Sequence, residues 1–288
     1  MSAVYRLVHP LLIASIALAA SGCTYHLAEV QQPGRSVAFT TAGPWRSMVY
    51  AARTDSGIVL VDLGWVGAGG KLRRRLRSLG ATPADVTDVF LTHSHRDHIR
   101  AWKVVRGARF HLWMPEEPLL EGTRRHVDFP SRVGRGVFGD AGPRPGEVEV
   151  RPFAHDTTFI VGRDTVRAYT LPGHTAGSAA YLFRGVLFVG DAVARKPLRG
   201  FGGADPFFSA DTKLNRQALI GLFARVPMER VEWVCNAHAK CARPSERYLA
   251  KVTRRPRPAS RTPAGARWRS APRGGSSHPP SRAGTRRA

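Results

Sequence analysis

The densest group of chemically capable side chains lies in His93–His98, which reads His-Ser-His-Arg-Asp-His and follows a short apolar run. In an extended segment, residues two apart project to the same side, so His93 and His95 are predicted to converge on one cation. Asp97 and His98 stand where the chain is expected to turn into a helix, so they can face a second cation. One segment therefore offers ligands to two metals about 3.5–4 Å apart, as two-metal hydrolytic sites require.

Three further candidate ligands each follow a predicted strand. They are His174 in Gly-His-Thr-Ala-Gly-Ser, Asp191 in Gly-Asp-Ala, and His238 in Asn-Ala-His-Ala. Loops at strand ends commonly carry functional residues on a rigid scaffold, and the glycines next to His174 and Asp191 permit tight turns. Imidazole and carboxylate donors without thiolate suit Zn²⁺, although Fe or Mn is compatible with the same donors. Together with the histidine cluster, these residues predict a metal centre with two Zn²⁺ ions.

The order of these motifs resembles that of the metallo-β-lactamase-fold hydrolase superfamily, over roughly residues 36–248. The pattern is an Asp after an early strand, His-x-His-x-Asp-His, Gly-His-Thr-x-Gly-Ser, Gly-Asp and a late His. Glyoxalase II-like and lactonase-like members share this ligand set. The resemblance implies that the first metal is held by His93, His95 and His174, the second by Asp97, His98 and His238, with Asp191 bridging both and Asp62 holding the cluster loop by hydrogen bonds. It also makes Asp97 and Asp191 the expected catalytic carboxylates.

The expected reaction is hydrolysis of an ester, thioester or lactone bond in a small molecule, and the basic charge of the chain favours an anionic one. A water shared by two cations is expected to have a pKa of about 7, and the metal-bridging hydroxide would attack a carbonyl carbon. Antibiotic hydrolysis is disfavoured, because a true β-lactamase is not expected to have the bridging carboxylate that Asp191 supplies. The residues Ile99-Arg100-Ala101 replace the usual small pair of the thioesterases, which puts their substrate geometry in doubt. Residues 113–144 are the expected lid, and His111 and His126 lie near enough to be weaker candidates for substrate contact.

Two other classes of function remain open. One is a mononuclear iron enzyme resembling persulfide dioxygenases, in which two His and one Asp hold the iron. The other is a noncatalytic surface lipoprotein that acts through its basic tail. Metal content distinguishes the dinuclear hydrolase from the mononuclear iron enzyme. Removal of the basic tail tests the noncatalytic lipoprotein hypothesis.

Hydrophobic periodicity predicts the elements that position these residues. Strands are expected near residues 47–52, 57–63, 86–91, 147–152, 158–161, 165–171, 181–183, 186–189 and 231–234, and helices near 71–79, 97–105, 211–225 and 244–252. A series of strands followed by a helix occurs twice along the chain, which predicts two β-sheets packed between helical layers. The resemblance implies the same fold class, an α/β four-layer αβ/βα sandwich of the metallo-β-lactamase type.

The N-terminus, residues 1–23, resembles a bacterial lipoprotein signal peptide. An apolar run too short to span a bilayer is followed by Ala-Ser-Gly-Cys23, so Cys23 is the expected lipidated residue; an ordinary signal peptide is the alternative. We expect export and anchoring in the envelope on the periplasmic side. Thr24 after the lipidated residue favours the outer membrane. A linker, residues 24–35, would lead into the domain at 36–250.

The formal net charge of +23 is concentrated at the C-terminus. Residues 251–288 contain ten Arg, one Lys and no acidic residue, together with many Pro, Gly and Ser. Such a segment buries too little apolar surface to offset its ordering entropy, so a disordered tail is predicted. A nucleic-acid partner is therefore not expected, and the remaining charge fits an anionic substrate or membrane surface. Nothing in the sequence indicates an oligomeric state.

Two cysteines, Cys235 and Cys241, flank His238. In an exported protein they would most simply form a disulfide that stiffens the loop carrying this ligand. The alternative is that one of them is an additional metal ligand.

Overall fold

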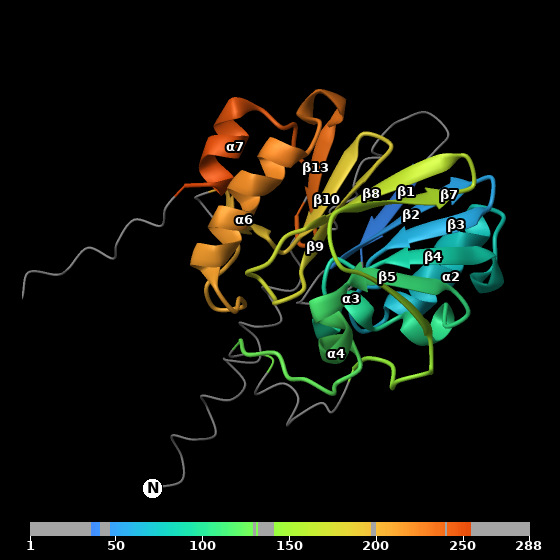
Figure 1. Ribbon diagram of the computed structural model, residues 1–288. Coiled ribbons are helices and arrows are strands. Elements are labelled where there is room, and N and C mark those ends of the chain that lie inside the picture. Colours follow the sequence, from blue (N-terminus) through green and yellow to red (C-terminus); the bar gives the residue numbers. More distant parts are fainter. Residues whose placement is uncertain are drawn as a thin grey trace, which may run out of the picture. The chain divides into compact units, whose positions relative to one another are not determined.

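The computed structural model describes residues 36–40, 47–128, 131, 141–196, 200–239 and 241–254. In these residues two β-sheets pack face to face and helices cover the outer faces, which confirms the expected four-layer sandwich (Figure 1). The expected signal peptide with Cys23, the linker at 24–35 and the chain beyond residue 254 lie outside the described residues. Within the described residues, no helix is long and apolar enough to cross a membrane.

The first sheet has six strands in sequence order. They are β1 (Ser36–Thr40), β2 (Met48–Thr54), β3 (Gly57–Val61), β4 (Val86–Phe90), β5 (Arg109–Trp113) and β6 (Glu149–Phe153). The strands from β3 to β6 run parallel, whereas β1 and β2 are antiparallel to their neighbours. Helix α2 (Ala68–Ser78), which overlaps the helix predicted near 71–79, covers the outer face through its fully buried Leu72 and Leu76.

The second sheet has the order β13-β10-β9-β8-β7. Its strands are β7 (Thr157–Val161), β8 (Asp164–Thr170), β9 (Ala179–Phe183), β10 (Val186–Gly190) and β13 (Trp233–Asn236). Helices α6 (Thr212–Arg225) and α7 (Glu246–Val252) cover its outer face, with Leu219, Leu222 and Val252 fully buried. A small separate hairpin, β11 (Val193–Lys196) and β12 (Gly200–Gly203), was not predicted, and neither were β1 and β5.

The apolar layer between the two sheets also contains one of the candidate histidines. The side chain of His111 is buried, shares a hydrogen bond of 2.7 Å with Asp88, and stacks on Phe90 with a centroid distance of 4.6 Å. The expectation that His111 contacts substrate is therefore wrong. Its burial in an aromatic cluster, against a buried carboxylate, makes it part of the core.

One predicted helix is interrupted in the structure, and another buries an unexpected polar residue. The helix expected at 97–105 is split into α3 (Arg96–Ile99) and the 3₁₀ turn η2 (Trp102–Val104), because the N–H groups of Arg100 and Ala101 donate to carbonyls of residues 64 and 63. In α6, Leu214 is exposed and Asn215 is buried, since the Asn215 side chain accepts a hydrogen bond from the backbone of Ala204. Helix α7 ends at the buried Val252, as predicted, and begins at Glu246, two residues later than predicted.

The remaining short helices connect the sheets to the loops. They are η1 (Pro83–Asp85), η3 (Met114–Glu116), α4 (Glu117–Leu120) and η4 (Met228–Arg230). Two of them, η3 and α4, belong to the expected lid at 113–144. In the described part of that region, Glu116, Leu119, Leu120 and Asp128 are buried, so these positions are anchored to the domain.

Candidate metal centre

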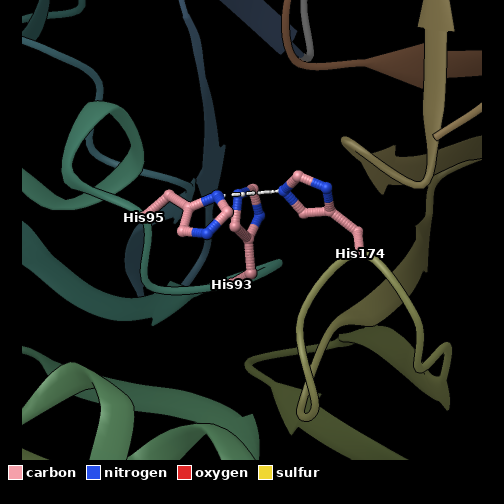
Figure 2. Close-up of side chains that lie close together, drawn as sticks. All are labelled: His93, His95 and His174. Atoms are coloured by element: carbon pink, nitrogen blue, oxygen red, sulfur yellow. Dashed lines mark hydrogen bonds between the residues drawn. The ribbon is translucent and has the colours of Figure 1, made fainter. Parts of the chain in front are cut away.

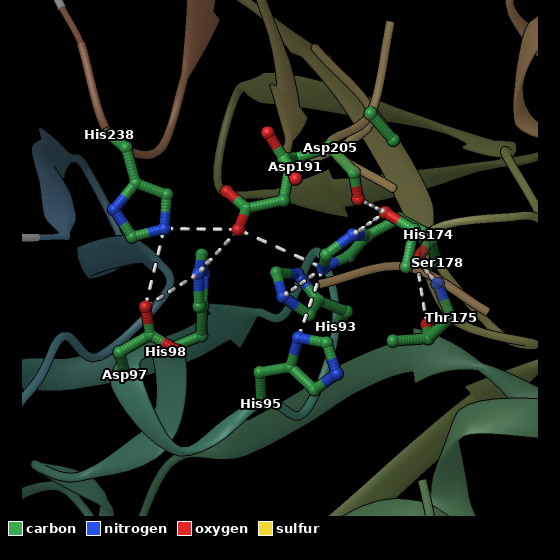
Figure 3. Close-up of polar contacts among 12 residues, drawn as sticks. His93, His95, Asp97, His98, His174, Thr175, Ser178, Asp191, Asp205 and His238 are labelled. Atoms are coloured by element: carbon green, nitrogen blue, oxygen red, sulfur yellow. Dashed lines mark hydrogen bonds and ion pairs between the residues drawn. The ribbon is translucent and has the colours of Figure 1, made fainter. Parts of the chain in front are cut away.

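The strand directions bring all seven predicted ligands to one edge of the sandwich. Strands β3 and β4 are parallel, and β8, β10 and β13 share one direction because β9 is antiparallel to both β8 and β10. Each predicted ligand follows the carboxyl end of one of these strands, as functional residues commonly do in sheets of this kind. Figure 3 shows the resulting cluster of His93, His95, Asp97, His98, His174, Asp191 and His238.

The first group consists of three buried imidazoles, His93, His95 and His174. The Nε2 atom of His174 lies 3.1 Å from Nε2 of His93 and 3.0 Å from Nδ1 of His95, and Figure 2 shows the rings converging from two loops. All three side chains are less than a tenth exposed. Their facing nitrogens can bind a single cation.

Hydrogen bonds on the far side of each ring determine which nitrogen carries the proton. The Oγ1 hydroxyl of Thr92 donates to the Asp62 carboxylate at 2.8 Å, so it accepts from Nδ1–H of His93 at 3.1 Å. Nδ1 of His98 donates to Asp62 at 3.0 Å. These bonds make Nε2 the nitrogen that each of the two histidines presents to the centre. Asp62 therefore holds the cluster loop, as the resemblance implied.

The other two rings are held in the same way by residues that the sequence did not indicate. The Ser209 hydroxyl donates to the Asp205 carbonyl at 2.6 Å, so it accepts from Nδ1–H of His174 at 3.0 Å. Nε2–H of His95 donates to Asp128 at 3.0 Å. The inner nitrogens of these rings then carry lone pairs, which is the protonation state that a metal ligand needs.

The second group contains Asp97, His98 and His238, with Asp191 between the two groups. The Oδ2 atom of Asp191 lies 3.0 Å from Nε2 of His238 and 3.7 Å from Nε2 of both His98 and His174. Asp97 Oδ2 lies 3.2 Å from Nε2 of His238. One carboxylate oxygen is thus within reach of donors from both groups, as expected for a bridging ligand.

The electrostatics of the two groups differ in the metal-free protein. Burial, with a smaller contribution from the neighbouring His95, lowers the pKa of His174 to about 3. Burial alone would also lower the pKa of His98, but the carboxylates of Asp97 and Asp191 outweigh it and raise this pKa to about 10. Burial would likewise lower the pKa of His238, and Asp191 raises it well above its ordinary value. Protonated imidazoles therefore balance the carboxylates of the second group.

The donor set fits two cations on three observations. The facing imidazole nitrogens of the first group lie 3.0–3.1 Å apart, close enough to bind one cation. In the second group, among the described residues, His98 Nε2 and Asp191 Oδ1 are buried and lack a hydrogen-bond partner. Buried carboxylates require compensating positive charge, which divalent cations would supply.

A buried carboxylate, Glu116, connects the two loops that carry the first group. Its Oε1 atom accepts from the backbone N–H and the hydroxyl of Ser94, both at 2.7 Å, and its Oε2 atom accepts from Thr175 Oγ1 at 2.7 Å and Gly177 N at 3.0 Å. Sequence reasoning missed this residue, because a single Glu at the start of a loop-rich segment has no local pattern. Its role depends on two loops that are distant from it in the chain.

The predicted disulfide between Cys235 and Cys241 is present, which leaves neither sulfur as a thiolate ligand. It closes a short loop with His238 near its middle. Inside this loop, Asn236 Oδ1 accepts from the backbone N–H of His238 and Ala239, at 3.2 and 2.7 Å. The position of His238 is thus held by covalent and hydrogen-bonded constraints.

A sequence-family model described as the metallo-beta-lactamase superfamily matches residues 42–227, more than half of the chain. The chain is 28% identical over 143 residues to the probable metallo-hydrolase YqgX of Bacillus subtilis, which covers 48% of this chain and 61% of the relative. It is 25% identical over 153 residues to BaeB of Bacillus velezensis, a probable polyketide biosynthesis zinc-dependent hydrolase, covering 52% and 56%. The matches thus span less than two thirds of the length of these relatives.

Solved structures share the fold at low sequence identity. A metallo-beta-lactamase from Pontibacter korlensis has a TM-score of 0.57 at 20% identity, covering 77% of this chain and 95% of that chain. The B3 metallo-beta-lactamase BLEG-1 has a TM-score of 0.55 at 20% identity, covering 72% and 94%. A metallo-beta-lactamase family protein of Thermus thermophilus has a TM-score of 0.55 at 21% identity, covering 76% and 78%. At these identities the likeness establishes the fold alone.

Proposed function

The chain belongs to the metallo-beta-lactamase superfamily, and from this premise we propose that it is a dinuclear metal hydrolase of an ester, thioester or lactone bond. The observation that carries the proposal is the position of Asp191 Oδ2, which lies within 3.7 Å of imidazole nitrogens from both ligand groups. A site for one metal would not require imidazole donors from both groups around this oxygen. His93, His95 and His174 would hold one cation, and Asp97, His98 and His238 the other.

The chain's own residues give the centre an open and a closed side. The side chains of His98 and His174 are at most 1% exposed, whereas that of His238 is 37% exposed and that of Asp97 is 22% exposed. Substrate would therefore approach along the His238 side. When bound, the two cations would polarise the substrate carbonyl and lower the pKa of a shared water.

Asp97 contributes as an ionised group. Burial would raise its pKa, but His98 and His238 outweigh burial and lower this pKa to about 2. The carboxylate is therefore deprotonated at neutral pH and acts as an acceptor or ligand. It does not store a proton for the leaving group.

Zinc is the proposed metal, since the donors are imidazole and carboxylate and one relative is named a zinc-dependent hydrolase. Fe or Mn would fit the same donors. An anionic small molecule is the proposed substrate class, in keeping with the excess of basic over acidic residues in residues 24–250.

Metal analysis combined with a substrate screen tests the proposal. We expect two zinc ions per chain and hydrolysis of at least one member of a panel of esters, thioesters, lactones and β-lactams. One iron per chain with production of sulfite from a persulfide would instead identify an oxygenase. A metal-free chain that hydrolyses none of the panel would contradict the proposal outright.

Export and anchoring form a separate part of the proposal. The supporting feature is Ala-Ser-Gly-Cys23 after a short apolar run, which would place the domain on the periplasmic side of the envelope. Cys23→Ser should abolish labelling by a radioactive fatty acid and release the protein from membranes. Unchanged labelling of the variant would contradict lipidation at Cys23.

A further inference from the structure

A short segment of the expected lid contacts the first ligand group at three points. Asp128 Oδ2 accepts from Nε2–H of His95 at 3.0 Å, and the His126 ring lies against the His95 ring at a centroid distance of 4.5 Å. His126 Nε2 lies 3.1 Å from Ser94 Oγ, whose hydroxyl donates to Glu116 and so accepts from His126. Residues 126–128 therefore hold the tip of the loop between the first two ligands.

The Asp128 carboxylate is itself held in place. It is 5% exposed, and its other oxygen, Oδ1, accepts from the backbone N–H of Ser131 at 2.9 Å. A carboxylate with both oxygens engaged and little solvent contact has a defined orientation. It can therefore impose an orientation on the His95 ring.

From this geometry we infer that Asp128 is a positioning residue for metal binding. By accepting from Nε2–H, it fixes the His95 ring with Nδ1 directed at His174, another member of the first group. It thereby couples the first metal to the conformation of residues 126–128. The inference rests on the proposed function, because it takes His95 to be a metal ligand.

The coupling has a physical consequence in both directions. If residues 126–128 move away, His95 loses the acceptor that fixes its tautomer and its ring orientation, and the first metal binds less tightly. Conversely, a bound metal favours the conformation in which Asp128 meets His95, so metal binding should protect this segment from hydrogen exchange. A segment expected to set specificity would thus also set metal affinity.

The test uses the full chain, stripped of metal and titrated with Zn²⁺ in competition with a chromophoric chelator. Asp128→Ala should weaken binding of one of the two ions by about 10–100-fold and leave the other nearly unchanged. Asp128→Asn keeps one acceptor oxygen and should have an intermediate affinity. In the wild type, Zn²⁺ should slow hydrogen exchange of the segment around 121–128, and this protection should be lost in Asp128→Ala.

A matched control is Asp88→Ala, which removes a carboxylate from another buried His–Asp pair, that of His111. It should lower stability without changing the affinity for either ion. If Asp128→Ala does not fold, the Co²⁺ absorption spectrum and Zn²⁺ affinity of Asp128→Asn carry the same comparison.

Two results would overturn the inference. One is wild-type affinity for both ions in Asp128→Ala or, where that variant does not fold, a wild-type Co²⁺ spectrum and affinity in Asp128→Asn. The other is a third bound ion in the wild type that is lost in both Asp128→Ala and His126→Ala, because Asp128 would then be a ligand. A wild type that binds no metal would instead refute the proposed function.

Discussion

At the scale of single residues, the position of Asp191 determines whether the centre is one site or two. Its Oδ2 atom faces imidazoles from the loops after β4, β8 and β13, and its Oδ1 atom is buried without a hydrogen-bond partner among the described residues. An unpartnered buried carboxylate oxygen is costly unless a cation binds to it. This geometry supports the proposal that Asp191 is a metal ligand.

Asp191→Ala should remove most of the activity and at least one of the two metals. The loss of a bridging ligand weakens both sites, so we expect hydrolysis to fall by more than about 100-fold, beyond the effect of a typical supporting residue. Elemental analysis and turnover on the same sample measure this. Asp55→Asn, at an exposed carboxylate, is the control, and an Asp191→Ala variant with both metals and full turnover would contradict the assignment.

Metal binding should depend on pH differently in the two groups. His98, whose pKa is raised to about 10, is protonated at neutral pH and must lose a proton to bind a cation, whereas burial has already made His174 neutral, with a pKa of about 3. The affinity for the second ion should therefore rise by about tenfold per pH unit for each proton released, up to a pH of about 10. Calorimetric titrations in buffers of different ionisation enthalpy would count the protons. A second-site affinity that is constant from about pH 6 to 8 would contradict this.

At the scale of elements, the ligands are carried by short loops whose geometry is constrained from outside. The His174 loop contacts the start of α6, where Ala210 N and Asp211 N donate to carbonyls of residues 174 and 173. The His238 loop contacts β2, where Met48 N donates to the carbonyl of Ala237 at 2.7 Å. The loops are thus held in place by neighbouring strands and helices. A steric change at these contacts should therefore alter metal binding.

Gly173→Ala should unfold or distort the His174 loop. Gly173 has a φ of +125°, and an added Cβ would lie 2.2 Å from the backbone N of Asn215 in α6. We expect a loss of at least about 2 kcal/mol in the free energy of unfolding, together with weaker metal binding. Denaturant unfolding with and without Zn²⁺ measures both effects.

The matched control for this substitution is Gly221→Ala. Gly221 lies within α6, and a Cβ there would meet no atom within 4 Å. That variant should be more stable by up to about 1 kcal/mol, because Ala has the higher helix propensity. Equal stability losses in both variants would show that the close contact at Gly173 is not the cause.

Removal of the disulfide by Cys235→Ala with Cys241→Ala should lower stability and loosen the second metal. A closed loop of this length contributes about 2 kcal/mol by restricting the unfolded chain, and Cys235 is also buried in the layer between the sheets. The loop carries His238, so affinity for the second ion should fall more than that for the first. Thermal unfolding and the chelator competition are the measurements, and an equal loss at both sites would contradict the assignment of His238 to the second group.

At the scale of the whole molecule, about half of the net positive charge lies outside the part of the chain that carries the candidate ligands. Residues 251–288 carry ten Arg and one Lys, whereas the ligands all lie between residues 93 and 238. The helix that covers the second sheet nevertheless extends into the basic segment. Val252 is fully buried, and the carbonyl of Thr253 accepts from the Arg216 side chain at 2.7 Å.

Truncation after Arg254 and truncation after Ala250 should therefore differ. The longer variant should keep wild-type stability and bind two metals, whereas the shorter one loses Val252 and should be less stable by about 2 kcal/mol. Unfolding curves of both variants decide this. A large loss of metal binding in the longer variant would mean that the tail takes part in the centre.

The sequence by itself determined the fold class and the set of candidate ligands that follow strands. The candidate ligands lie in compact sequence motifs. The helix that contains Leu72 and Leu76 and the β9–β10 hairpin each have a hydrophobic pattern that is visible within a few consecutive residues. The pairing of Cys235 with Cys241 was predictable for the same reason, since few residues separate them. The predicted helix at 97–105 was wrong because backbone donors of Arg100 and Ala101 pair with a distant loop.

Only the tertiary structure decided how each ligand is oriented. The acceptors that fix the imidazoles come from other segments: Asp62 lies 36 residues before His98, Asp128 lies 33 residues after His95, and Ser209 lies 35 residues after His174. Single polar residues at such separations form no periodic pattern, so no sequence window contains both partners. Folding brings them together, and the hydrogen bonds they then make select the nitrogen that each histidine presents to a metal.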